Sequence, residues 1–354
     1  MSEKILFVGA GAIGSYIGAF LSRAGHDVTL VDAWAEQVET IRRQGIAVTG
    51  PHDPFTAQPK AVHLHEAQRL PRDFPIVFIA MKAYDTAWAA QLALRHAAPD
   101  GVIVSSQNCW PDPIVASVTG AQRTVGLIMS KIGVAVWKPG EVERGVEKGQ
   151  SQGHDVFRVG EHDGRTTQRA KRLSEMLSLI DGSQVTDNLW GERWAKLCAN
   201  AMGNPVTAMS GLGSFEIASS DAGRAITIHL AGESARVGIA LGYRVPKFNG
   251  ESAERWADSA RRETWHALDA MLTPKSATGR NWRASMGQDV IKGRPTEIDY
   301  MNGYVVDQGK AARVPTPVSI ATVEMVRDVE AGRRKPAAAN IAEVLQRAGV
   351  QEHR

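Results

Sequence analysis

The chain has 354 residues, of which 43% are hydrophobic and 22% are charged, and 41 Lys and Arg against 38 Asp and Glu leave a net charge of +3. This is the composition of an ordinary globular protein, long enough for about two domains. It argues against collagen-like repeats, a disordered acidic tail and a strongly basic nucleic-acid binder. No apolar run reaches the roughly 18 residues of a membrane span. Cys109 and Cys198 are too few for a disulfide scaffold, so we expect a cytoplasmic protein with no membrane or nucleic-acid partner.

The first half of the chain alternates short apolar runs with helical patterns. A helix is predicted over Ala12–Arg23, directly after the first strand. Strands are predicted at Lys4–Val8, Asp27–Val31, Pro75–Met81, Gly101–Ser106 and Thr124–Met129. Weaker strand signals at 156–159 and 184–186, with a helix over 167–179 between them, would extend the same sheet. Nearly continuous apolar strands separated by helices predict an α/β Rossmann-type domain, a doubly wound parallel sheet covered on both faces.

From about Leu189 onward the apolar spacing becomes helical and the runs become longer. Helices are predicted over 217–241, 253–271 and 320–330, which indicates an all-α second domain. We place the boundary at this change of period, with a Rossmann-like domain over 1–186 and a helical substrate domain over 187–354.

A glycine-rich loop lies between the first strand and the first helix. Gly9, Gly11 and Gly14 form a G-x-G-x-x-G in which Ala12 and Ile13 open the helix. The first glycine permits a tight turn, the second lets the backbone approach a pyrophosphate, and the third allows the helix to lie close to the strand. The order strand, glycines, helix, strand predicts a dinucleotide site, because the helix N-terminus attracts phosphate.

Asp32 ends the second strand, 18 residues after Gly14. A carboxylate at this place accepts hydrogen bonds from the adenosine ribose and repels a 2′-phosphate. No base follows before Arg42, so the sequence favours NAD, with NADP as the alternative. The simpler interpretation is that Asp32 merely terminates the strand.

A polar stripe runs through an apolar segment near the start of the second domain. Lys196, Asn200 and Asn204 are spaced i, i+4, i+8 and would share one helix face. Such a stripe is usually only the solvated face, but asparagine is a poor helix former and needs another reason to occur twice. Pro205 would kink or end the helix beside Asn204. A lysine flanked by amides can act as proton donor and substrate clamp.

A second polar cluster comprises residues 285–289 and 293–300. Its simplest explanation is a helix start, with Thr296 as the cap and Glu297 and Asp299 as acids of the first turn.

Together these motifs resemble the ketopantoate reductase (2-dehydropantoate 2-reductase) family. The resemblance covers nearly the whole chain and keeps the family's order. Its motifs are the glycine loop, Lys82 in Met-Lys-Ala, Asn108 after Ser-Ser-Gln, Lys-Leu-x-x-Asn-x-x-x-Asn-Pro-x-Thr-Ala over 196–208, and Ser-Met-x-Gln-Asp with Thr-Glu-Ile-Asp-Tyr-Met-Asn-Gly over 285–303.

The resemblance implies a hydride transfer between NAD(P)H and the ketone of a 2-oxo acid. Lys196 would be the general acid, and Glu297 would assist it. The other implied roles are substrate binding by Asn200, Asn204 and Ser285, and cofactor binding by Lys82 and Asn108. A small 2-oxo or hydroxy acid is thus the expected partner, no metal site is expected, and a homodimer is compatible with this architecture.

Several departures from the family pattern bear on the substrate. Cys109 stands where the family has glycine, Gly287 replaces a bulky residue, and Ser214 replaces an asparagine. The segment from Asn249 to Trp282 is longer than in compact members and carries Trp256, Trp265 and Trp282, each of which could line a pocket or fill the core. These changes predict room for a larger, less polar substrate.

The family's arginine for the cofactor phosphate has no match at Ala33. Because cells keep NAD mostly oxidised, an NAD enzyme would more naturally oxidise a hydroxy acid. The alternatives are therefore a catabolic dehydrogenase of a larger hydroxy acid and a non-catalytic NAD-binding redox sensor. The presence of both Lys196 and Glu297 argues against the sensor.

His63 and His65 alternate on a predicted strand, but no third metal ligand accompanies them.

Overall fold

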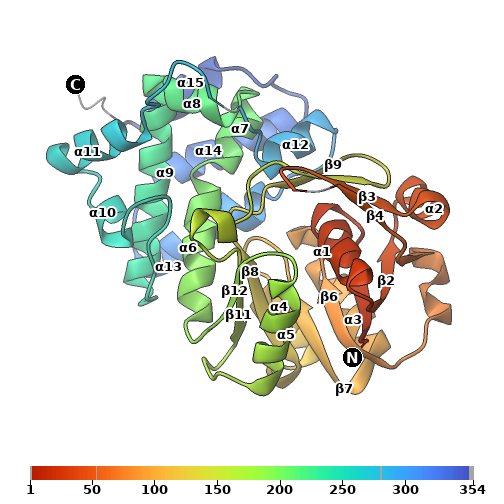
Figure 1. Ribbon diagram of the computed structural model, residues 1–354. Coiled ribbons are helices and arrows are strands. Elements are labelled where there is room, and N and C mark those ends of the chain that lie inside the picture. Colours follow the sequence, from red (N-terminus) through yellow and green to blue (C-terminus); the bar gives the residue numbers. More distant parts are fainter. Residues whose placement is uncertain (1, 53, 280, 351–354) are drawn as a thin grey trace. The chain divides into compact units, whose positions relative to one another are not determined.

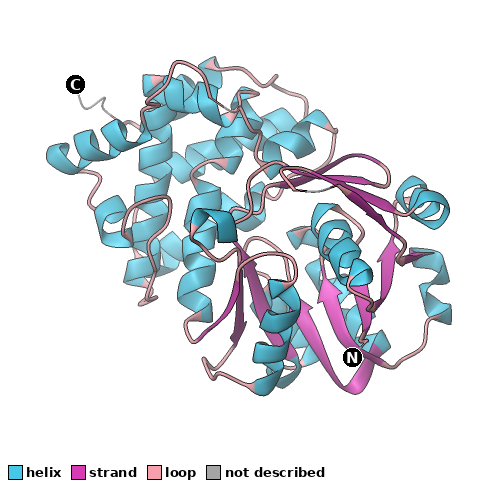
Figure 2. Ribbon diagram, in the orientation of Figure 1, coloured by secondary structure: helices cyan, strands magenta, loops and turns pink. Residues whose placement is uncertain are grey.

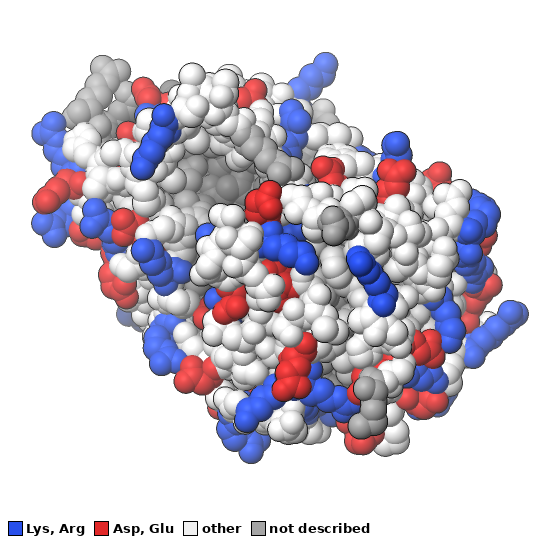
Figure 3. Space-filling view, in the orientation of Figure 1, with Lys and Arg blue, Asp and Glu red and all other residues white. Residues whose placement is uncertain are grey.

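The computed structural model describes residues 2–52, 54–279 and 281–350. It divides into two compact units, Met1–Leu189 and Trp190–Arg354, close to the predicted change of period (Figure 1). Within the described residues, no helix combines the length and the apolar character needed to cross a membrane. On the face drawn in Figure 3, basic and acidic side chains are interspersed.

The first unit is built on a mixed sheet. Its eight strands, in spatial order, are β12 (Ser183–Thr186), β11 (Phe157–Glu161), β8 (Thr124–Met129), β7 (Ala97–Ser105), β6 (Phe74–Ile79), β1 (Lys4–Val8), β2 (Asp27–Asp32) and β5 (Lys60–His63). All neighbours pair in parallel except β11, which runs antiparallel to β8. The chain leaves β1 in one direction for β2 and later in the other for β6, so the strand order reverses beside β1. Ligands of open α/β sheets bind at such a reversal, at the carboxyl ends of the strands.

Each face of this sheet has its own apolar core. Along β1, Ile5 and Phe7 belong to one cluster and Leu6 and Val8 to the other, as the strand period of two requires. The first cluster is covered by α1 (Ala12–Arg23), α2 (Ala35–Gln44) and α5 (Gln168–Ser178), and the second by α3 (Thr86–His96) and α4 (Asp112–Thr119). The predicted doubly wound Rossmann-type domain is confirmed.

A second, smaller sheet was not predicted. Its strands, in spatial order, are β4 (Phe55–Ala57), β3 (Ile46–Thr49), β10 (Glu141–Arg144) and β9 (Val134–Lys138). These strands contact α1. Arg144 is fully buried there, paired at 2.5 Å with the fully buried Asp181. Strands this short, joined across almost a hundred residues, leave little periodic signal in the sequence.

The second unit is helical (Figure 2). Among its described residues, strand-like pairing is limited to an isolated bridge between Phe248 and Glu251. Its elements are α6 (Leu189–Ala201), α7 (Asn204–Ser210), α8 (Ser214–Ser219), α9 (Asp221–Ala240), α10 (Ala253–Ala257), α11 (Arg262–Leu272), α12 (Ser285–Ile291), a π-helical turn (Asp299–Gly303), α13 (Tyr304–Ala312), α14 (Pro317–Glu330) and α15 (Ala339–Arg347). The long helix α9 contacts α8, α10, α11, α13, α14 and α15.

Two of the predicted helices are interrupted. The predicted helix over 217–241 breaks at Ser220, whose side chain accepts a hydrogen bond from the backbone N–H of Gly223 and caps α9. The predicted helix over 253–271 breaks between Ala257 and Arg262. Apolar periodicity continues across both breaks, so periodicity alone does not locate them.

Candidate functional site

The glycine loop follows β1 and opens α1. Gly9 has φ +111°, and a Cβ there would come within 2.8 Å of the carbonyl oxygen of Ala80. A Cβ on Gly14 would lie 2.0 Å from the carbonyl oxygen of Gly9. A Cβ on Gly11 would meet nothing within 4 Å, so the space before the helix N-terminus is open. Ala12 and Ile13 start the helix, and its first turn carries no acidic residue that would compete with an anion. The residues present fit a pyrophosphate.

Asp32 ties the end of β2 to this loop. Its Oδ2 accepts a hydrogen bond from the backbone N–H of Ala10 at 2.5 Å, and its Oδ1 accepts one from that of Trp34 at 2.8 Å. The side chain therefore does more than terminate a strand. Each carboxylate oxygen has capacity for a further hydrogen bond, so both can also receive a ribose hydroxyl.

The first base after Asp32 in the sequence is Arg42, which forms ion pairs with both Glu39 and Glu66. Glu39 also contacts His63 Nε2 at 2.7 Å, and this hydrogen bond lowers the pKa of Glu39. The guanidinium of Arg42 is thus already engaged by two carboxylates.

The prediction that His63 and His65 share a strand is wrong. β5 ends at His63, and His65 lies in the 3-10 turn Leu64–Arg69. The two rings instead stack at 5.2 Å. Within the described residues, no group of three or more His, Cys, Asp and Glu could hold a metal ion.

Lys82 and Asn108 follow the neighbouring parallel strands β6 and β7. Both are half-buried at the carboxyl edge of the sheet. The buried Gln107 joins their loops: its Nε2 lies 3.1 Å from the carbonyl oxygens of Met81 and Lys82 and 3.0 Å from Thr86 Oγ1. Sequence reasoning gave Gln107 no role, although the Ser-Ser-Gln strand end contained it.

Cys109 adopts a left-handed backbone conformation, with φ +65°, and is 2% exposed. A side chain in this region is strained, and glycine adopts it without that cost. The structure thereby gives the physical reason why a glycine suits this position, and cysteine occupies it here under strain.

In the second unit, α6 buries Trp194, Leu197, Cys198 and Ala201, spaced as one face of a helix. The Trp194 Nε1–H donates to the carbonyl oxygen of Ser234 on α9 at 2.9 Å. Burial raises the pKa of the Cys198 thiol to about 12. Because this face is anchored in the core, the half-buried Lys196 and Asn200 lie on the opposite side of the helix.

The predicted polar stripe is broken before its third member. α6 ends at Ala201, and Asn204 is the first residue of α7, with Pro205 in that helix's first turn. The helix therefore ends shortly before Pro205, as the sequence predicted. Asn204 is 6% exposed, and its Nδ2 lies 3.6 Å from the sulfur of Met301. It is a buried contact residue and does not continue the solvated face.

Glu297 precedes the π-helical turn and is 3% exposed. Thr296 Oγ1 accepts a hydrogen bond from the backbone N–H of Ile298 at 3.2 Å, but the turn begins after Ile298 and has no side-chain cap, so the expected threonine cap is not formed. Within the turn, the fully buried Asn302 donates through Nδ2 to the carbonyl oxygen of Ala201 at 3.1 Å. The turn that follows Glu297 is therefore bonded to the last residue of α6, five residues after Lys196 and one residue after Asn200. Sequence reasoning gave Asn302 no role, although the motif over 285–303 contained it.

Ser285 begins α12, which lies against α7. A Cβ on Gly287 would come within 2.7 Å of Thr207 Oγ1. Gly287 therefore permits a close helix contact, and the expectation that it opens space for substrate is wrong.

Trp256 and Trp265 are 0% and 6% exposed, so they fill the core, while Trp282 is half-buried.

Comparison with known proteins identifies the family. The model of the ketopantoate reductase PanE/ApbA family matches residues 5–161, and the model of its C-terminal domain matches residues 188–330. The chain belongs to the ketopantoate reductase family. It is thus a nicotinamide-dependent oxidoreductase of that family.

Relatives match over almost their entire lengths. The 2-dehydropantoate 2-reductase of Archaeoglobus fulgidus is 28% identical over 93% of this chain and 99% of its own length. The 2-dehydropantoate 2-reductase of Mesorhizobium japonicum is 27% identical over 92% of this chain and 97% of its own length. A PanE/ApbA family ketopantoate reductase from Ralstonia eutropha has the same fold, with a TM-score of 0.74 and 22% identity over 93% of this chain and 99% of its own. The D-mandelate dehydrogenase solved with NADH and anilino(oxo)acetate has a TM-score of 0.75 and 21% identity over 93% of this chain and 99% of its own.

Proposed function

We propose that this enzyme transfers hydride between a nicotinamide cofactor and the ketone of a 2-oxo acid, with Lys196 as the general acid. The observation that carries the proposal is the connection within the second unit. The anchored helix α6 presents Lys196 and Asn200, and its end is bonded through Asn302 to the turn that follows Glu297. A lysine and a carboxylate held on connected elements can act on one substrate.

The bound cofactor supplies the hydride, and negative charge then grows on the substrate oxygen. Lys196 Nζ would donate the proton to that oxygen, and the Glu297 carboxylate would orient the ammonium group. The amides of Asn200 and Asn204 would hold the substrate by hydrogen bonds, and the Ser285 hydroxyl would bind its polar end. The burial of Glu297 strengthens its interaction with a cation.

For the cofactor, we assign the pyrophosphate to the loop formed by Gly9, Gly11, Ala12, Ile13 and Gly14. Asp32 would accept the ribose hydroxyls, and Lys82 and Asn108 would bind at the ends of β6 and β7. NAD is preferred over NADP in this proposal. A 2′-phosphate would approach the Asp32 carboxylate, while Arg42 is engaged by Glu39 and Glu66.

Ketopantoate is the first candidate substrate, because full-length relatives are named 2-dehydropantoate 2-reductases. The second candidate is a larger hydroxy acid oxidised with NAD. The similarity to D-mandelate dehydrogenase with NADH and the carboxylate at Asp32 support it. The buried tryptophans and the Gly287–Thr207 contact lend it no support.

We also infer a cytoplasmic enzyme that acts as a homodimer. A neighbouring fold, with a TM-score of 0.67 and 15% identity over 94% of this chain, is a dimeric ketopantoate reductase from Staphylococcus aureus. Light scattering of the purified protein tests the homodimer, and the mass of a single chain would contradict it.

The deciding experiment measures initial rates of ketopantoate reduction with NADH and with NADPH, for the unaltered enzyme, Lys196→Ala and the control Lys310→Ala. Lys310 is an exposed lysine of α13. We expect Lys196→Ala to lose about 10²- to 10⁴-fold in rate while it still binds NADH, and Lys310→Ala to retain activity. An unchanged rate in Lys196→Ala would refute the general acid. Turnover of phenylglyoxylate but not of ketopantoate would favour the second substrate.

A further inference from the structure

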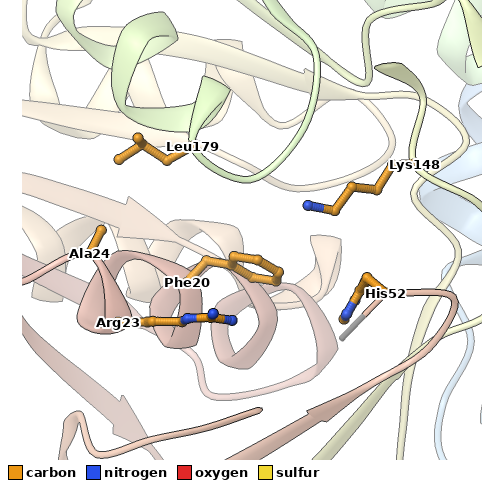
Figure 4. A pocket seen from close by; sticks show the side chains of 6 residues that line it. All are labelled: Phe20, Arg23, Ala24, His52, Lys148 and Leu179. Atoms are coloured by element: carbon orange, nitrogen blue, oxygen red, sulfur yellow. The ribbon is translucent and has the colours of Figure 1, made fainter. Parts of the chain in front are cut away.

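A separate pocket lies in the first unit at the C-terminal end of α1. It has a volume of about 410 Å³ and is lined by Phe20, Arg23, Ala24, His52, Lys148 and Leu179. Figure 4 shows the Lys148 side chain reaching over Phe20, with Leu179 across the opening. Because α1 rises about 1.5 Å per residue, roughly 15 Å of helix separate this pocket from the glycine loop. A ligand in it would leave the proposed pyrophosphate position unobstructed.

The pocket combines positive charge with an aromatic floor. Lys148 Nζ lies 5.3 Å from the centroid of the Phe20 ring, and the Arg23 guanidinium lies 4.4 Å from that of Phe55. The two rings meet edge to face at 4.8 Å. Both cations are thus held against one aromatic pair.

Among the residues that the structure describes, neither Arg23 nor Lys148 forms an ion pair with a carboxylate, and no residue lining the pocket is acidic. Leu179 is 56% exposed, which leaves an apolar side chain beside the two cations. Basic groups next to exposed apolar surface suit a ligand with a negative end and a flat apolar body.

We propose that this pocket binds a small aromatic anion, either a carboxylate or a phosphate monoester, with its charge on Arg23 and Lys148 and its ring against Phe20 and Leu179. His52, whose ring stands edge-on to Phe20 at 5.7 Å, closes one side. The site is independent of the proposed reaction, and its occupant binds whether or not the enzyme turns over.

Calorimetric titration of the full chain with phenyl phosphate tests this proposal, with inorganic phosphate and benzyl alcohol as comparisons. We expect phenyl phosphate to bind about tenfold more tightly than either, because only it uses both the cations and the ring. Arg23→Met/Lys148→Met should weaken binding about tenfold or more, whereas Lys171→Met, at an exposed lysine outside the pocket, should not. Phe20→Leu should weaken phenyl phosphate more than inorganic phosphate.

Three outcomes would overturn the proposal. Unchanged binding in the double variant would place the ligand elsewhere, and displacement by saturating NADH would place it in the cofactor site. Absence of binding would mean that Arg23 and Lys148 only offset the negative C-terminal end of α1. Thermal unfolding of each variant confirms that it remains folded.

Discussion

Asn302 and Ala201 are 101 residues apart in sequence, yet a hydrogen bond of 3.1 Å joins the side-chain amide of one to the carbonyl oxygen of the other. Ala201 is the last residue of α6, where the helix leaves its carbonyl groups without helical partners. One buried amide therefore satisfies a helix end and joins the helix that carries Lys196 to the turn after Glu297.

The stability lost on replacing Asn302 should depend more on the charge of the new side chain than on its size. Asn302→Leu leaves the Ala201 carbonyl without its donor and should cost about 1–3 kcal/mol in the free energy of unfolding. Asn302→Asp should cost more, because it also buries a carboxylate against that carbonyl oxygen. Urea unfolding of both variants measures the difference. Equal losses in the two variants would contradict the role of charge, and unchanged stability in Asn302→Leu would show that this hydrogen bond contributes nothing.

The preference for NADH over NADPH should change when the exposed residue Ala33 is replaced by arginine. Ala33→Arg places a guanidinium beside the proposed 2′-phosphate position, and Ala33 itself is exposed. We expect kcat/KM with NADPH to rise about tenfold, since a charge-assisted hydrogen bond contributes roughly 1.5–3 kcal/mol, while NADH use changes little. Ala121→Arg, at an exposed alanine before β8 on the opposite edge of the sheet, is the control. An equal response in both variants would contradict the assignment.

Cys109→Gly should stabilise the protein or leave its stability unchanged. The left-handed backbone at φ +65° costs a cysteine about 1 kcal/mol or more that glycine does not lose, although glycine gains freedom in the unfolded chain and the small buried thiol is lost. Cys109→Ala keeps the strain and should be the less stable variant. Thermal unfolding compares the two, and a more stable alanine variant would refute strain at this position.

A methyl group at Gly287 should collide with α7. Gly287→Ala puts a Cβ where Thr207 Oγ1 would be 2.7 Å away, and overpacking of this kind costs about 1–3 kcal/mol. Thr207→Ala removes the colliding atom, so the double variant should lose less stability than the sum of the two single variants. Additive losses in urea unfolding would mean that the two positions do not meet.

The buried Asp181 should make stability depend on acid pH. Its carboxylate accepts hydrogen bonds from the backbone N–H groups of Gly149, Gln150 and Gly182 and from the guanidinium of Arg144. Burial alone raises the pKa of Asp181, but these donors outweigh it and hold the pKa below its ordinary value of 3.8. The unfolded chain therefore takes up the proton first as the pH falls.

The stabilising contribution of Asp181 is accordingly complete above the unfolded pKa and is lost as the pH falls through the folded pKa. Unfolding measured from pH 6 down to pH ~3 should show a smaller loss of stability in Asp181→Asn than in the unaltered protein. Asp100→Asn, at an exposed acid, should keep the original slope. The same slope in all three proteins would contradict the role of Asp181.

The sequence by itself determined the local order of the chain. Strand, glycines, helix and acid follow one another within residues 4–32, and each depends on neighbours along the chain, so periodicity and residue type were enough to predict them. The second, helical unit was predicted for the same reason. The motifs over 196–208 and 285–303 gave the family and its candidate residues, whose roles here remain predictions.

Only the tertiary structure decided which of those residues meet. Gln107 joins the loops after two strands, Asn302 reaches α6, and Thr207 fills the space that Gly287 was expected to open. The second sheet likewise pairs β3 with β10, far along the chain. Each of these contacts joins segments distant in sequence, and the free energy that selects it comes from packing and from the pairing of buried polar groups, which no local pattern records.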